Sequence, residues 1–143
     1  MKHQVIEFLS DTDLDSLLEE ANKIRDLHWG KTITYSRKVF VPLTNMCRNT
    51  CSYCTFVKGP DSDEATILTK DQVIDIIKEG QKKGCKEVLF SLGEKPELRY
   101  PIARRALKRL GFNSMVDYLK EVCQLTLQMS NLIPHANAGT LSL

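Results

Sequence analysis

Three short apolar runs, separated by helix-length segments, constrain the fold of this chain most strongly. The runs cover residues 38–43, 87–92 and 132–137. The segments 69–84 and 114–129, which lie between them, repeat apolar residues at helical spacing. This alternation is typical of parallel strands joined by right-handed crossovers. The sequence therefore predicts an α/β fold with about three parallel strands.

A further helix is predicted before the first strand. Leucine, isoleucine and alanine recur at helical spacing over residues 11–28, and Ser10 and Asp13 have the spacing of a capping box. We expect this amphipathic helix to pack on the outside of the rest of the fold. Residues 1–35 are then an N-terminal helical extension, and residues 36–143 are an incomplete α/β domain.

Three cysteines follow the first predicted strand with the spacing C-x₃-C-x₂-C: Cys47, Cys51 and Cys54. Thiolates select soft metals. A zinc site would need a fourth ligand, and ferredoxin-type runs supply four thiolates. The remaining cysteines, Cys85 and Cys123, stand alone in the sequence. Three thiolates therefore indicate a four-iron cluster with one iron left open to a ligand from outside the protein.

Composition excludes several classes of protein. The chain has 143 residues, of which 42% are hydrophobic and 27% are charged, as in ordinary globular domains. A net charge of +2 does not indicate nucleic-acid binding, and no apolar stretch reaches the ~20 residues of a membrane span. No secretory signal is recognised at the N-terminus. Five cysteines, three of them crowded together, favour a reducing, cytoplasmic location.

Basic residues gather in two places. Residues 27–60 contain five Lys or Arg and no Asp or Glu, which would suit the negative charge of a cluster and its cosubstrate. Residues 101–110 carry four more Lys or Arg with no aromatic residue between them, and we interpret this segment as a solvated helix.

The cysteine motif, with Tyr53 directly before its third cysteine, resembles the cluster loop of radical S-adenosyl-L-methionine (SAM) enzymes. The wider segment 39–56 is similar to one subfamily, which makes the deazaflavin FO (7,8-didemethyl-8-hydroxy-5-deazariboflavin). Residues 91–97 and 132–139 resemble the same subfamily. The resemblance extends from about residue 34 to the end of the chain.

This resemblance implies a 4Fe-4S cluster, with one iron bound by each of the three cysteines and SAM on the fourth iron. Gly93 and Glu94 resemble the glycine-rich segment that holds the SAM amino group in these enzymes. Many members have Gly-Gly-Glu-Pro there; here Leu92 replaces the first glycine and Lys95 is inserted. Tyr53 is expected beside the adenine of SAM, with simple packing as the alternative.

The resemblance also implies an activity. An FO synthase subunit is a radical SAM lyase of coenzyme F-420 biosynthesis. Its 5′-deoxyadenosyl radical abstracts hydrogen from a tyrosine–ribitylaminouracil adduct, and ring closure releases ammonia. The adduct comes from a partner radical SAM subunit, and a ferredoxin- or flavodoxin-type donor supplies electrons. The alternatives are the tyrosine-coupling partner subunit, a menaquinone- or biotin-pathway relative, an iron–sulfur fragment without SAM cleavage, and a zinc-binding module.

The implied fold is a partial (βα)₆ TIM-like barrel, of which this chain would hold the N-terminal half. A full (βα)₈ barrel needs roughly 200–250 residues. We therefore expect the N-terminal part of a longer protein, or alternatively a small chain that depends on a partner. On the third strand His135 is interpreted as a satisfied core histidine, with a place near the barrel mouth as the alternative. Cys85 and Cys123 are interpreted as small buried hydrophobic residues.

Overall fold

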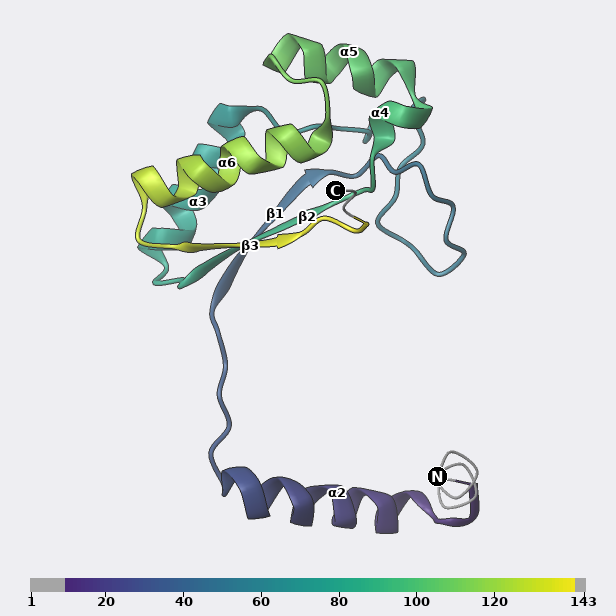
Figure 1. The fold of residues 1–143 in the computed structure, drawn as a ribbon, viewed down its shortest axis with the longest axis vertical. Coiled ribbons are helices and arrows are strands. Elements are labelled where there is room, and N and C mark those ends of the chain that lie inside the picture. Colours follow the sequence, from purple (N-terminus) through teal and green to yellow (C-terminus); the bar gives the residue numbers. More distant parts are fainter. Residues whose placement is uncertain (1–9, 141–143) are drawn as a thin grey trace. The chain divides into compact units, whose positions relative to one another are not determined.

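The computed structural model describes residues 10–140 (Figure 1). The expectation about a secretory signal concerns residues outside this range. The chain divides into two compact units, residues 1–35 and 36–143, which are described separately. The first unit contains helix α2 (Leu14–Trp29). The second contains β1 (Lys38–Thr44), α3 (Lys70–Lys82), β2 (Glu87–Leu92), α4 (Pro96–Arg99), α5 (Pro101–Leu110), α6 (Met115–Met129) and β3 (Ile133–Asn137).

The helix predicted over residues 11–28 is present as α2, but its cap differs from the prediction. The backbone leaves helical geometry at residues 12–13, and Asp13 takes the N-cap position. Its carboxylate accepts hydrogen bonds from the Ser16 amide at 3.0 Å and from the Ser16 hydroxyl at 2.6 Å. The predicted capping role of Ser10 is therefore wrong. No residue of α2 is buried, and its packing stays a prediction.

The three strands form one parallel sheet in the order β1-β2-β3. Val41 of β1 lies beside Phe90 of β2, and Phe90 lies beside Ala136 of β3. The register between β1 and β2 shifts between Pro42 and Thr44. The predicted α/β architecture, with three parallel strands and a helix before them, is confirmed.

The hydrophobic core lies between one face of this sheet and the helices α3 and α6 (Figure 1). Side chains alternate between the two faces of a strand, so Val41, Leu43, Val88 and Phe90 all point into this core and are fully buried. On the other face of the sheet Phe40 is 51% exposed. The sheet of residues 36–140 thus has one covered face and one open face.

Helix α3 begins as the sequence predicts. The Gln72 amide donates to Thr69 Oγ1 at 3.3 Å and the Thr69 amide donates to Gln72 Oε1 at 2.8 Å, which completes a capping box. Farther along α3, a Cβ added to Gly80 would lie 2.6 Å from the Cβ of Val39. Glycine therefore permits the close approach of α3 to β1.

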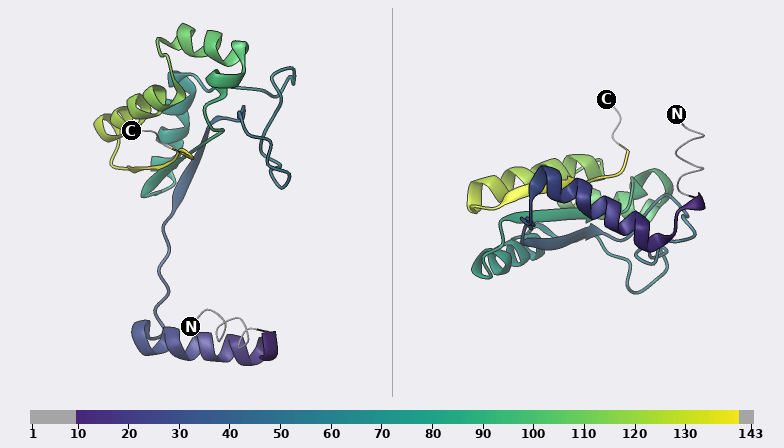
Figure 2. Two further views of the ribbon diagram at one scale, coloured as in Figure 1. Left: turned by 45° about the vertical axis from the view of Figure 1, so that its right-hand side comes forward. Right: turned by 90° about the horizontal axis from the view of Figure 1, so that it is seen from below.

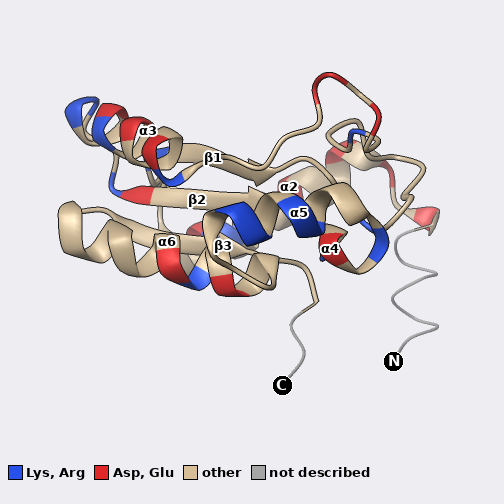
Figure 3. Ribbon diagram, turned by 90° about the horizontal axis from the view of Figure 1, so that it is seen from above, with Lys and Arg blue, Asp and Glu red and all other residues tan. Residues whose placement is uncertain are grey.

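The chain between β2 and β3 contains three helices. The four-residue helix α4 is not predicted by the sequence pattern; Lys95 precedes it with φ 38°, and Pro96 is its first residue. Helix α5 buries Ala103 and Leu107, and its Lys and Arg residues are exposed, which confirms the interpretation as a solvated helix. Figure 3 shows the basic residues along this helix in blue. Helix α6 begins after Ser114, whose hydroxyl accepts from the Asp117 amide at 3.0 Å.

Among the described residues, no helix has the length and apolar character needed to cross a membrane.

Candidate functional site

The cysteine loop, residues 45–58, follows β1 and lies past the carboxyl end of that strand (Figure 2). The Lys58 amide donates to the Asn45 carbonyl at 3.0 Å and so closes the loop at its base. The Asn45 side chain donates to the Glu64 carbonyl at 2.7 Å and accepts from the Thr66 amide at 2.8 Å. Asn45 therefore ties the cysteine loop to the segment that leads into α3.

The three cysteines differ in their surroundings. Cys47 is 7% exposed, and its Sγ accepts the amides of Asn49 at 3.4 Å and Glu94 at 3.2 Å. Cys51 is exposed and Cys54 is partly buried, and a turn joins them in which the Cys54 amide donates to the Cys51 carbonyl at 3.1 Å. Within residues 10–140, no three His, Cys, Asp or Glu side chains are gathered to hold a metal ion. The structure thus brings Cys47 to the end of β2 but does not gather the three thiols.

Gly93 lies against the backbone of the cysteine loop. Its amide donates to the Thr44 carbonyl at 2.9 Å. A Cβ at this position would lie 2.0 Å from the Met46 carbonyl oxygen and 2.9 Å from the Cys47 Cβ. Only glycine allows so close an approach, because the nearest atoms belong to backbone. The glycine predicted to hold a ligand is thus required by the loop itself.

Glu94 is bonded to the cysteine loop through its backbone and its side chain. Its Oε1 accepts from Arg48 Nη2 at 2.6 Å and its Oε2 accepts from Asn49 Nδ2 at 2.6 Å. Its carbonyl accepts the Arg48 amide at 2.9 Å. Hydrogen bonds from Asn49 and then Arg48 hold the pKa of the Glu94 carboxyl below its usual value. The side chain is only 12% exposed, so the pair is partly shielded from water.

Tyr53 is 85% exposed. Packing of its ring, the alternative to a place beside adenine, is therefore not observed within the described residues. Cys85 and Cys123 are partly buried against the core, and burial raises the pKa of the Cys123 thiol. This fits their interpretation as small hydrophobic residues.

The interpretation of His135 as a core histidine is wrong. Its side chain is 51% exposed, because it projects from the open face of the sheet. Its Nδ1 lies 3.1 Å from Glu87 Oε2, at the amino end of β2, and so away from the cysteine loop. Glu87 also pairs with Lys38 and accepts the Ser36 hydroxyl at 2.6 Å. The bond from Lys38, then those from Ser36 and His135, lower the pKa of Glu87 to about 2.

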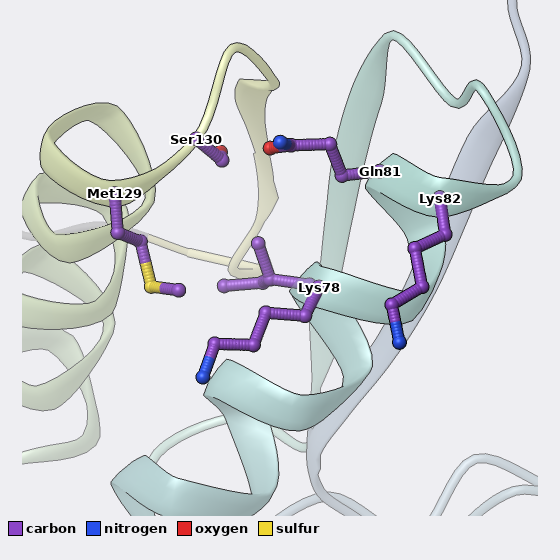
Figure 4. A pocket seen from close by; sticks show the side chains of 6 residues that line it. Lys78, Gln81, Lys82, Met129 and Ser130 are labelled. Carbon is purple, nitrogen blue, oxygen red and sulfur yellow. The ribbon is translucent and has the colours of Figure 1, made fainter.

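A pocket between α3 and α6 contains none of the predicted site residues (Figure 4). Lys78, Gln81 and Met129 are among the side chains that line it, close to the carboxyl ends of both helices. The Asn131 amide donates to Gln81 Oε1 at 3.4 Å. Because a crossover helix ends where the next parallel strand begins, this pocket is at the amino edge of the sheet. It therefore has no connection with the cysteine loop.

Sequence reasoning missed the residues that hold the loop in place. Arg48 and Asn49 bind the Glu94 carboxylate, and Arg99 Nη1 donates to the Arg48 carbonyl at 2.7 Å. The basic bias of residues 27–60 is the one signal that included Arg48. No sequence pattern pairs it with an acid 46 positions away.

The chemistry of the donor set fits an iron–sulfur cluster. One loop supplies three thiol side chains, and the Glu94 amide already donates to one of the sulfur atoms. Hydrogen bonds to sulfur ligands are among the features that tune such clusters. To hold one cluster, Cys51 and Cys54 must approach Cys47.

Residues 41–131 match the family model of the Radical SAM superfamily. Because this match covers more than half of the chain, the protein belongs to the radical SAM superfamily, as its cysteine motif predicts.

The chain is similar to curated proteins that are named FO synthase or 7,8-didemethyl-8-hydroxy-5-deazariboflavin synthase. It is 44% identical over 139 residues to the FO synthase of Nocardia farcinica, covering 91% of this chain and 16% of that protein. It is 42% identical over 110 residues to the 7,8-didemethyl-8-hydroxy-5-deazariboflavin synthase of Methanopyrus kandleri, covering 77% of this chain and 33% of that protein. It is 36% identical over 141 residues to the synthase of the same name from Methanococcus vannielii, covering 99% of this chain and 39% of that protein.

The chain thus spans between about a sixth and two fifths of the length of these relatives. The predicted resemblance to the FO-forming subfamily is confirmed. No solved structure gives a significant match.

Proposed function

We propose that this chain carries the cluster-binding part of an FO synthase. The whole enzyme would be a carbon–nitrogen lyase of coenzyme F-420 biosynthesis. It would form FO from a tyrosine–ribitylaminouracil adduct, with ring closure and release of ammonia. The similarity to synthases of this name, at 36–44% identity over most of the chain, is the observation that carries the proposal.

Cys47, Cys51 and Cys54 would each bind one iron of a 4Fe-4S cluster, which leaves the fourth iron to SAM. When bound and reduced, the cluster and SAM supply a 5′-deoxyadenosyl radical that abstracts hydrogen from the adduct. Cys47, which is nearly buried and bonded to the Glu94 amide, would be the fixed ligand. Cys51 and Cys54, in the more exposed part of the loop, would move toward it.

Gly93, Glu94 and Tyr53 would contact SAM. The Glu94 carboxylate accepts two hydrogen bonds in the structure, and a carboxylate has about four lone-pair sites. Capacity for the SAM ammonium group therefore remains. The exposed ring of Tyr53 is free to lie beside the adenine.

A partner radical SAM subunit would supply the adduct, and a ferredoxin- or flavodoxin-type protein would supply electrons, in the cytoplasm. Within the chain, residues 36–143 would be the incomplete barrel domain and residues 1–35 a helical extension. The parallel sheet, with the cysteine loop at the carboxyl end of β1, supports this division.

The test is anaerobic reconstitution of the chain with iron and sulfide, followed by dithionite and SAM. We expect a brown protein with about four irons per chain that produces 5′-deoxyadenosine. Cys51→Ala should lose the cluster, whereas Cys85→Ala, which changes a cysteine outside the loop, should keep it. In a full-length synthase that contains this chain, addition of the tyrosine–ribitylaminouracil adduct should then give FO.

Two results would contradict the proposal. Full iron content in Cys51→Ala would show that the loop is not the cluster site. Formation of 5′-deoxyadenosine without FO by the full-length protein, when the partner subunit and the adduct are present, would indicate a radical SAM enzyme with another substrate.

A further inference from the structure

Glu94 has a second role that the resemblance does not assign. We infer that Glu94, through Arg48 and Asn49, is a positioning residue that clamps the cysteine loop onto the end of β2. The inference rests on the proposed function in one respect, namely that Cys47 binds iron. The clamp itself consists of contacts within the chain.

Three hydrogen bonds hold Arg48 in place. Its amide donates to the Glu94 carbonyl at 2.9 Å and its guanidinium donates to the Glu94 carboxylate at 2.6 Å. Its own carbonyl accepts Arg99 Nη1 at 2.7 Å. Backbone and side chain of the residue next to Cys47 are thus both bound to the segment that follows β2.

Asn49 completes the clamp. Its side-chain amide donates to the second oxygen of the Glu94 carboxylate at 2.6 Å, while its backbone amide donates to Cys47 Sγ at 3.4 Å. One carboxylate therefore restrains the two residues that follow Cys47. In the other direction, the Glu94 amide donates to the same sulfur at 3.2 Å.

The Arg48–Glu94 contact is partly shielded from water. The Glu94 side chain is 12% exposed, and that of Arg48 is 36% exposed. A charge-assisted hydrogen bond that is partly shielded from water is stronger than a neutral bond at the surface. Gly93 adds to the fit, because the loop backbone occupies the space that a side chain would need. The sulfur of Cys47 is therefore held in place before any metal binds.

A direct role on SAM and a clamp on the loop predict different results when SAM is absent. If Glu94 only binds the SAM ammonium, its loss leaves the loop of the metal-free protein unchanged. If it is a clamp, its loss loosens the loop in the metal-free protein and weakens cluster retention without SAM.

The experiment compares Arg48→Met, Glu94→Gln and the double variant with the wild type in the full chain. Arg105→Gln is the matched control, because Arg105 is an exposed arginine of α5. Amide hydrogen exchange at Arg48 and Asn49 is measured in metal-free protein. We expect each single variant to speed exchange by roughly tenfold, the scale of one lost charge-assisted hydrogen bond.

Amide exchange in the double variant should be no faster than in the faster-exchanging single variant, because both changes break the same pair. Arg48→Lys, which keeps the charge but only part of the hydrogen-bonding geometry, should restore part of the protection. After reconstitution without SAM, the Arg48→Met and Glu94→Gln proteins should lose iron to a chelator several-fold faster than the wild type.

Exchange and iron loss within twofold of both wild type and Arg105→Gln would overturn the clamp. Failure of the proposed function gives a different result, because the wild type would then make no 5′-deoxyadenosine. The exchange rates in metal-free protein would still test the clamp.

Discussion

At Gly93 the absence of a side chain allows the cysteine loop to lie against the end of β2. The Met46 carbonyl and the Cys47 Cβ occupy the volume beside its Cα. At Gly59, by contrast, a Cβ would meet nothing within 4 Å. Gly93 is therefore tied to the position of the cysteine loop, whereas Gly59 is not.

Gly93→Ala should destabilise the protein or displace the loop. The added Cβ would lie 2.0 Å from backbone oxygen, which cannot rotate away. Overpacking of this kind costs about 1–3 kcal/mol. Urea unfolding followed by circular dichroism measures the loss, and iron content after reconstitution should fall with it. Gly59→Ala should change the free energy of unfolding by less than about 0.5 kcal/mol; an equal effect of both changes would contradict the explanation.

The lowered pKa of Glu87, at the amino ends of the strands, makes the free energy of unfolding depend on pH. Lys38, Ser36 and His135 stabilise its ionised form and lower its pKa to about 2 from 4.5. The unfolded chain therefore binds this proton more tightly than the folded chain. The stabilisation is complete above pH 4.5 and is lost as the pH falls from 4.5 toward 2.

Glu87→Gln should accordingly lower the free energy of unfolding at pH 6–7, and its difference from the wild type should shrink toward pH 3. Urea titrations at a series of pH values measure this difference. Asp63→Asn, a change at an exposed loop position, is the control and should show little effect. A difference that is constant with pH would rule out the ionised network as its source.

At the scale of elements, local signals determined most helix ends. Thr69 and Gln72 close both bonds of the predicted capping box at α3. By contrast, α4 has no side-chain cap, and Arg104 of α5 donates to the Glu97 carbonyl at 2.7 Å. A four-residue helix is too short to show a periodic pattern in the sequence.

Thr69→Ala should therefore cost about 1 kcal/mol of stability, because the Gln72 amide loses its acceptor. Thermal unfolding should show a lower midpoint. Thr34→Ala, at an exposed threonine outside any helix or strand, serves as the control. An unchanged midpoint in Thr69→Ala would mean that the capping box adds nothing to the stability of α3.

Across the whole sheet, the two faces differ in how much apolar surface they remove from water. Phe90 is fully buried under α3 and α6, whereas Phe40, on the adjacent strand, lies 51% exposed on the open face. Both are aromatic residues within a strand. The face that each one occupies therefore determines how much apolar surface it removes from water.

Phe90→Ala should cost about 3–5 kcal/mol, which is enough to unfold a marginally stable domain. Phe40→Ala should cost less than about 1 kcal/mol, because the side chain is already half in water. Circular dichroism during urea unfolding compares the two. A greater loss in Phe40→Ala would mean that the open face is covered in solution.

The order of the strands and the chemistry of the loop can be predicted from the sequence alone. Apolar runs separated by helix-length segments favour parallel strands, because a parallel pair needs a crossover of about that length. The spacing of Cys47, Cys51 and Cys54 places three soft ligands on one loop, and this signal is local. The family could be predicted for the same reason, since its motif is contiguous in the chain.

The contacts between distant residues, in contrast, are visible only in the folded chain. Arg48 and Glu94, His135 and Glu87, and the carbonyl of Met46 over Gly93 are brought together by the parallel register and by the path of the loop. Each of these contacts depends on two segments about 46 to 48 residues apart. Side-chain periodicity reports which face a residue occupies, but it holds no information about the partner across that distance.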